Sequence, residues 1–193
     1  MEDKSECIDE ILQRELKMFT SVNARGPAPC RSNPEGFILH RRAQFSVWSS
    51  ETLTSYLNDL KTAENEDKNL MTLKYARMEG IIDPLNENPL IDEIVAMEYK
   101  WQKEALTRYP AVLGGARPLS SGDDSAWATS FETYLRGELE TYSDETLRLL
   151  HNDLLQMKGK EANYSLEVYD YLMRSMGYES LDEAEERIRN KNA

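Results

Sequence analysis

The feature that most constrains this sequence is that it repeats itself. The segment Ile8-Asp-Glu-Ile11 returns 83 residues later as Ile91-Asp-Glu-Ile94. The segment Trp48-Ser-Ser-Glu-Thr-Leu53 returns 94 residues later as Tyr142-Ser-Asp-Glu-Thr-Leu147. Both matches occur in the same order within one plan of elements, which predicts a duplicated unit over residues 5–79 and 88–176. The alternative is that two helical segments share capping residues and leucines by coincidence.

The pattern of apolar residues predicts helices in both copies. Apolar residues recur at steps of three and four, as in Ile8, Ile11 and Phe19, while the prolines and glycines cluster in loops. Residues 24–36 and 112–127 are predicted loops, and Pro110 is predicted to end the helix before the second of them. A short charged helix is expected over 180–190. The predicted fold is an all-α helical bundle of two pseudo-symmetric repeats, forming one domain over residues 1–193.

Charge excludes two classes of partner. The chain has 23 Lys and Arg against 35 Asp and Glu, for a net charge of −12. We therefore expect it to bind neither nucleic acid nor an anionic membrane surface, because both require an excess of cations. The sequence has no long apolar run, no apolar leader in MEDKSECIDE and only two cysteines, so a cytoplasmic protein is expected.

Glutamates interrupt the apolar faces at matching places. Glu15 lies on the apolar stripe of the first predicted helix, and Glu98 lies on the matching stripe of the second copy. Glu138 matches Gln44 among large apolar residues, and Arg42 and Arg136 flank these faces. A carboxylate on an apolar face is costly unless it is paired or hydrogen-bonded. Two interpretations follow, namely a structural network of buried ion pairs or a polar pocket for a small molecule.

Other candidate residues lie in and after the second loop. Arg117, in a Gly/Pro-rich stretch, could hold a substrate anion, and Trp127 and Tyr134 could line the pocket mouth or belong to the core. His40 and His151 are isolated, and no zinc, di-iron or nucleotide-binding motif is present, so no cofactor is expected. A carboxylate site for magnesium or manganese, made by Glu15, Glu98 and Glu138, is a lesser alternative.

One long segment carries a family resemblance. The stretch from Trp127 to Leu147, WATSFETYLRGELETYSDETL, resembles the hallmark of domain-of-unknown-function family 4125. The segments 44–48 (QFSVW) and 69–78 (NLMTLKYARM) are similar to it as well. The resemblance implies a single helical domain, and it brings no known reaction. Within the motif it implies roles for Glu132, Tyr134, Arg136 and Glu138.

The predicted function is an acid–base enzyme that needs no metal. It would be a lyase, hydrolase or isomerase acting on a small amino-acid-like or carboxylated metabolite held between the two repeats. Its catalytic residues would be Glu15, Glu98 and Glu138, and its substrate-binding residues would be Arg42, Arg117, Trp127, Glu132, Tyr134 and Arg136.

The alternative is an acidic, non-catalytic binding or regulatory module; the family resemblance implies a nucleotidyltransferase-like partner for it. A cavity that contains Glu15 or Glu98 would favour the enzyme. A filled core with a broad exposed apolar patch would favour the module. The sequence makes no prediction of oligomeric state.

Overall fold

The protein is helical wherever its backbone is described. A computed structural model describes residues 3–22, 33–125 and 128–191, and over these ranges it contains ten α-helices and no β-strand. None of the helices found there has the length and apolar character needed to cross a membrane. The helices are α1 (Lys4–Thr20), α2 (Pro34–Val47), α3 (Ser50–Asn65), α4 (Leu70–Met78), α5 (Leu90–Arg108), α6 (Pro110–Leu113), α7 (Phe131–Leu139), α8 (Asp144–Gly159), α9 (Tyr164–Ser175) and α10 (Leu181–Lys191). The all-α prediction is confirmed.

Local signals set most helix ends. Side-chain oxygens of Ser49 and Ser143 cap α3 and α8, and those of Asn69 and Asn163 cap α4 and α9. The prediction at Pro110 was incomplete, because α5 ends at Arg108 and the chain begins the short helix α6 at Pro110 itself. A proline is well tolerated in the first helical turn, where its missing N–H would have had no partner. The predicted loop 24–36 lies largely outside the described residues.

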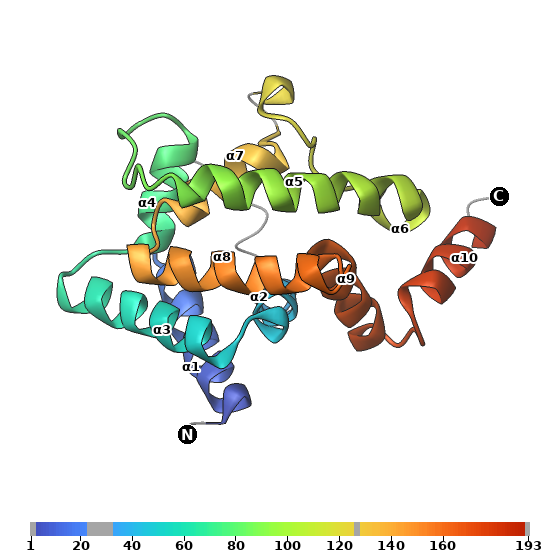
Figure 1. The fold of residues 1–193 in the computed structure, drawn as a ribbon, viewed down its shortest axis with the longest axis horizontal. Coiled ribbons are helices and arrows are strands. Elements are labelled where there is room, and N and C mark those ends of the chain that lie inside the picture. The colour runs from blue at the N-terminus through green and yellow to red at the C-terminus, as the bar shows by residue number, and fades with distance from the viewer. Residues whose placement is uncertain (1–2, 23–32, 126–127, 192–193) are drawn as a thin grey trace.

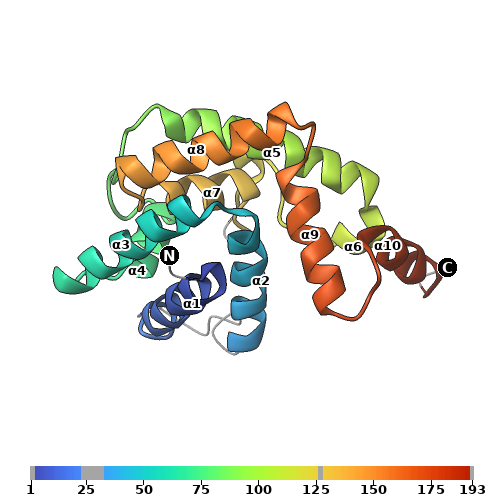
Figure 2. The same ribbon diagram turned by 60° about the horizontal axis from the view of Figure 1, so that its bottom comes forward.

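The helices pack as two groups that contact each other through three pairs of helices. In the first group α1 contacts α2, α3 and α4, and in the second α5 contacts α7, α8 and α9. Across the groups α3 lies along α8, α4 packs on α7, and α9 packs on α2. Figure 2 shows α10 at the end of the molecule away from α1, against α6 and α9. The core therefore lies between the groups, and it contains Ile11, Phe45, Leu53, Ile94 and Leu147.

Each group caps a helix of the other. The carboxylate of Asp153 on α8 accepts hydrogen bonds from the backbone N of Ser49 (2.9 Å) and the hydroxyl of Thr52 (2.6 Å) at the start of α3. Asp59 on α3 accepts the corresponding bonds from Ser143 N (3.0 Å) and the Thr146 hydroxyl (2.7 Å) at the start of α8. Helix N-termini attract negative charge, so these bonds fasten α3 and α8 together.

The residue with a left-handed backbone conformation after α8 leads to a first testable prediction. Glu161 has φ 57°, and the next residue, Ala162, donates its backbone N–H to the Met157 carbonyl at 3.0 Å. A side chain strains this conformation and glycine does not. We expect Glu161→Gly to raise the free energy of unfolding by about 0.5–1 kcal/mol in urea denaturation. Lys160→Gly, at a residue with φ −94°, is the control and should lower stability. Equal losses in both variants would contradict the prediction.

Candidate functional site

Arg41 of α2 joins the two groups of helices through a buried ion pair on each side. Its Nε and Nη2 donate to the two carboxylate oxygens of Glu15 on α1, at 2.8 and 2.6 Å. Its Nη1 donates both to Glu138 on α7 and to the side-chain oxygen of Gln44, at 2.7 Å to the latter. The phenol of Tyr56 on α3 adds a 2.6 Å hydrogen bond to Glu15. The side chains that donate hydrogen bonds to Glu15 therefore come from α2 and α3, and the Glu15 carboxylate is fully buried.

Glu138 is bound from two other helices and from the turn that follows α7. Arg41 reaches it from α2, Lys74 from α4, and the Tyr142 hydroxyl follows it along the chain at 2.7 Å. Burial alone would raise its pKa, but the positive charges of Arg41 and Lys74 hold the pKa of Glu138 far below the usual range. The ammonium of Lys74 also lies 3.6 Å from the ring centre of Tyr134. Two cations thus balance the two carboxylates Glu15 and Glu138, and Glu138 is ionised at neutral pH.

Glu98 is buried without such partners. Its exposed fraction is 5%, and among the described residues none forms a hydrogen bond or ion pair with it in the structure. Burial, together with the neighbouring negative charge of Glu138, raises the pKa of Glu98 to about 8. At neutral pH its carboxyl group is therefore protonated and neutral. Both predicted inward glutamates are buried, but of the two only Glu15 has hydrogen-bonding partners among the described residues.

The predicted substrate-binding arginines Arg42, Arg136 and Arg117 form no ion pair with Glu15 or Glu98. Arg42 pairs with Asp9 and Arg136 with Asp92, both near the surface, and the cation that reaches Glu15 is Arg41. Arg41 lies four residues after Phe37 and four before Phe45, so the helix turns it toward the core and turns Arg42 away.

Tyr134 lies between two cations. The guanidinium of exposed Arg117 lies 4.6 Å from the ring centre of Tyr134, whose ring also receives Lys74. Arg117 donates to the Thr129 carbonyl at 3.2 Å. Its contact with Tyr134 ties the second loop to α7. Trp127, the remaining predicted pocket residue, lies outside the described residues.

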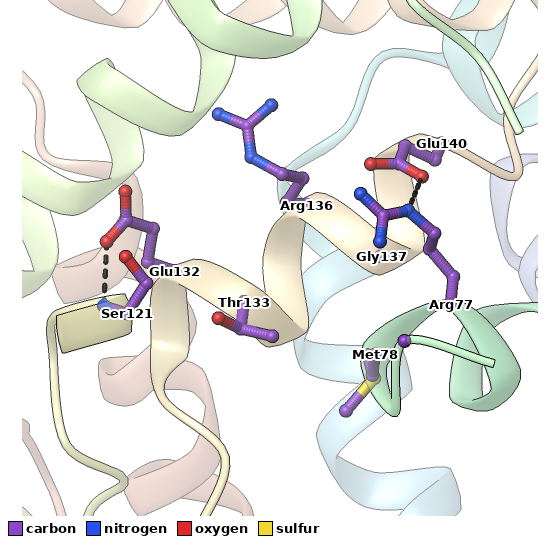
Figure 3. Close-up of a pocket in the computed structure, with 9 residues that line it drawn as sticks. Arg77, Met78, Ser121, Glu132, Thr133, Arg136, Gly137 and Glu140 are labelled. Carbon is purple, nitrogen blue, oxygen red and sulfur yellow. Dashed lines mark hydrogen bonds and ion pairs between the residues drawn. The ribbon is translucent and has the colours of Figure 1, made fainter. Parts of the chain in front are cut away.

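A surface pocket lies where α4 meets α7. It has a volume of about 310 Å³ and is lined by Arg77, Met78, Gly80, Ser121, Glu132, Thr133, Arg136, Gly137 and Glu140. Figure 3 shows the side chains of α7 along one side and Arg77 and Met78 of α4 on the other. A Cβ at Gly137 would lie 2.8 Å from the Met78 side chain, so a glycine permits this close approach of α4 and α7. The predicted residues Glu132 and Arg136 meet here.

The charged side chains of the pocket are held in place. Arg77 Nε donates to buried Glu140 at 2.6 Å, and Glu140 also accepts from the backbone N of Leu85 at 3.3 Å. Glu132 accepts the backbone N–H of Ser121 at 2.8 Å, and this hydrogen bond lowers the pKa of Glu132, which is therefore ionised. The dashed lines of Figure 3 mark the pairs Arg77–Glu140 and Ser121–Glu132. Two arginines and two glutamates line the pocket, of which Arg77 is paired with Glu140, and Arg136 with Asp92 outside the lining.

The three predicted catalytic glutamates do not line this pocket. Glu15, Glu98 and Glu138 are buried, and they also do not line a second pocket of about 430 Å³ at the ends of α2 and α8 beside α9. No group of three or more His, Cys, Asp or Glu in the described part of the chain is arranged to hold a metal ion. The structure therefore separates the buried carboxylates from the accessible surface.

Sequence reasoning missed four residues that matter here. Arg41 was detectable from its spacing to Phe37 and Phe45, and Lys74 from its place one turn after Leu70 and before Met78. Tyr56 and Arg77 carry no local signal, because their partners Glu15 and Glu140 come from distant helices.

The comparisons with known proteins identify the family and go no further. No curated protein matches the chain, and no solved structure matches it. A family model described as "Protein of unknown function (DUF4125)" matches residues 5–186, which is nearly the whole chain and includes the pocket and the buried network. The chain therefore belongs to the DUF4125 family of proteins of unknown function.

Proposed function

We propose that this protein binds a small carboxylated, amino-acid-like molecule in the pocket between α4 and α7. The observation that carries the proposal is the charge pattern of the lining, in which Arg77 and Arg136 stand with Glu132 around one small volume. Guanidinium groups recognise carboxylates with paired hydrogen bonds, and an ionised carboxylate attracts an ammonium group. A molecule that carries both charges satisfies both halves of the pocket.

The orientation of Arg77 supports the proposal that this residue binds the carboxylate of the ligand. Its Nε is occupied by buried Glu140, and no other hydrogen bond of its guanidinium occurs within the described residues. The terminal nitrogens are therefore available, and the rotational freedom of the side chain is already restricted. Ligand binding costs less when a side chain is held in place beforehand.

The buried network is better suited to a structural role than to catalysis. Lys74 on α4 and Glu138 on α7 are bonded to each other beneath the same two helices that form the pocket. In an acid–base reaction, a proton-carrying group would have to lie beside the ligand. The pocket carboxylates that could do so are Glu132 and Glu140, and both are engaged in hydrogen bonds. We therefore propose binding without turnover, as in the non-catalytic module predicted as the alternative.

Binding is tested with chemically defined probes. Titration calorimetry with L-glutamate, L-serine and succinate separates ligands with both charges from ligands with carboxylates alone. We expect an amino acid to bind, and we expect Arg136→Gln and Arg77→Gln to weaken binding at least about tenfold, since a charged hydrogen bond is worth about 1.5–3 kcal/mol. Arg148→Gln, at an exposed position on α8, is the matched control and should bind normally.

Two outcomes would overturn the binding proposal. One is that none of the three probes binds, and the other is that both pocket variants bind as tightly as the control. Conversion of a bound amino acid, followed by proton NMR, would instead favour the acid–base enzyme. Such conversion should then be lost in Glu132→Gln.

We also propose that the two groups of helices are pseudo-symmetric repeats of a duplicated unit. The helix contacts support this, because each contact within the first group has a counterpart in the second. The surface pairs Arg42–Asp9 and Arg136–Asp92 stand at matching positions, as do the reciprocal caps at Asp59 and Asp153. The two pockets match as well, since the α4–α7 pocket corresponds to the pocket beside α2 and α9.

A further inference from the structure

The segment between α4 and α5, residues 79–89, exposes apolar side chains. Its sequence is EGIIDPLNENP, and it joins the first group of helices to the second. Ile81 is 68% exposed and Leu85 is 40% exposed. Figure 1 shows this segment in green, projecting from the edge of the molecule beside α4. The other large apolar side chains that are exposed in the described part of the chain, Leu155 and Met176, occur singly on α8 and at the end of α9. Two such side chains close together mark a candidate contact surface.

The exposed side chains stand on a backbone that is held in place. The backbone N of Leu85 donates to the buried carboxylate of Glu140 at 3.3 Å. The side-chain amides of Asn86 and Asn88 both donate to Asp144 at the start of α8, at 3.3 and 2.8 Å. These bonds fasten the segment to the second group of helices, so little backbone freedom is left to lose when another molecule binds.

Carboxylates without partners alternate with the apolar residues along the segment. Glu79, Asp83 and Glu87 are exposed, and residues 79–89 include no lysine or arginine. Within the described residues these three carboxylates form no ion pair, whereas Glu140 and Asp92 in the adjoining helices are paired with arginines. We call Ile81 and Leu85, together with the three flanking carboxylates, the linker surface.

The charge of the linker surface decides between its possible occupants. A second copy of this chain would bring the same three carboxylates and a further net charge of −12 against the first copy. An anionic membrane surface would be repelled for the same reason. Apolar side chains with lysine or arginine beside them would cover Ile81 and Leu85 and would also pair with the carboxylates.

We propose that the linker surface binds a partner protein through a segment whose apolar side chains are flanked by lysine or arginine. Ile81 and Leu85 make the apolar contacts, and neither of them is used by the core of this chain. The carboxylates pair with the cations of the partner and speed its approach. This surface goes beyond the proposed small-molecule pocket and does not depend on the ligand of that pocket.

A synthetic helical peptide made of leucine and lysine tests the proposal with the full chain. Its leucines recur at steps of three and four, which gives one apolar face bordered by ammonium groups. We expect fluorescence anisotropy to show binding that weakens as salt is added, because salt screens exposed charges. A peptide of the same pattern, with glutamate in place of lysine, should bind at least about tenfold more weakly.

A matched pair of double variants tests the apolar contacts. Ile81→Ser combined with Leu85→Ser should weaken binding of the leucine–lysine peptide at least about tenfold, because a few apolar contacts carry most of the affinity of an interface. Leu155→Ser combined with Met176→Ser removes the other exposed apolar side chains and should leave binding unchanged. Circular dichroism should show both double variants folded, since substitutions at exposed positions have small effects on stability.

A second matched pair separates local charge from the overall charge of the chain. Asp83→Asn combined with Glu87→Gln removes two charges from the linker surface, and Glu51→Gln combined with Glu104→Gln removes two exposed charges elsewhere. We expect the first pair to weaken peptide binding about threefold or more at low salt, and the second pair to have a smaller effect. Equal effects would show that the peptide is attracted by net charge alone, and would overturn the proposal.

Other results would also contradict the linker surface as a docking site. These are absence of peptide binding, equal affinity for the glutamate peptide, and unchanged binding in the variant that lacks Ile81 and Leu85. A wild-type dimer in sedimentation velocity that separates in this variant would assign the surface to a second copy instead. If the amino-acid probes do not bind and the peptide results are as expected, the small-molecule proposal is rejected and the linker surface stands.

Discussion

Arg41→Met should lower the free energy of unfolding by about 3–5 kcal/mol, the largest single loss that the structure implies. The substitution keeps much of the side-chain volume and removes the charge that Glu15 and Glu138 share. Glu138 would then keep Lys74 and Tyr142, and Glu15 would keep only the hydroxyl of Tyr56. Urea denaturation followed by circular dichroism measures the loss.

The neighbouring arginine gives a matched control for this experiment. Arg42→Met removes the same charge from the same helix, but Arg42 pairs with Asp9 at the surface, where an ion pair contributes about 0–1 kcal/mol. Should Arg41→Met not fold at all, Tyr56→Phe removes one hydrogen bond to Glu15 and should cost about 1.5–3 kcal/mol. If Arg41→Met costs no more than Arg42→Met, the buried network does not hold the helices together.

The stability of the wild-type protein should fall as pH rises from about 5 to 8, and Glu98→Gln should remove this fall. In the unfolded chain Glu98 ionises near its ordinary pKa of 4.5, while in the folded protein it keeps its proton up to about pH 8. Between these values the unfolded state binds fewer protons, so stability decreases with pH by up to about 1.4 kcal/mol per unit. Above pH 8 the penalty is complete and no longer grows.

The comparison of variants isolates Glu98 from other ionising groups. Glu138, whose pKa is depressed in the folded protein, loses its stabilising contribution only as pH falls below about 4.5, outside this window. Thermal or urea unfolding at half-unit steps of pH gives the slope for wild type, Glu98→Gln and the exposed control Glu104→Gln. Identical slopes in all three proteins would show that Glu98 is ionised in the folded state at neutral pH.

The fold could be predicted from the sequence because its signals are local. The caps Ser49, Ser143, Asn69 and Asn163 lie directly beside the helices that they start, and the apolar spacing marks each buried face. The same spacing correctly placed Glu15 and Glu98 inside. The difference in hydrogen-bonding partners between them was not predictable, because it depends on which side chains of other helices reach each carboxyl group.

The partners in the site could not be read from the sequence for the same reason. To choose between the adjacent residues Arg41 and Arg42, the rotation of α2 about its own axis must be known to within one residue. Arg77 and Glu140, which shape the pocket, are 63 positions apart and meet only through the packing of α4 on α7. Such pairs are determined by the packing of one helix on another, and this packing cannot be read from the order of residues along a single helix.

The exchanged caps of α3 and α8 bear on the history of this chain. Under the proposed duplication, a single ancestral copy would have carried both the Asp acceptor and the Ser and Thr donors of this contact, now seen at Asp59 with Ser143 and at Asp153 with Ser49. Two such copies could have met as a homodimer before their genes were joined. Since then each half has supplied the capping carboxylate of a helix in the other half. A substitution of Asp59 therefore affects α8, and a substitution of Asp153 affects α3. The two halves must therefore have evolved as one unit, even while the residues around Glu15 and Glu98 diverged.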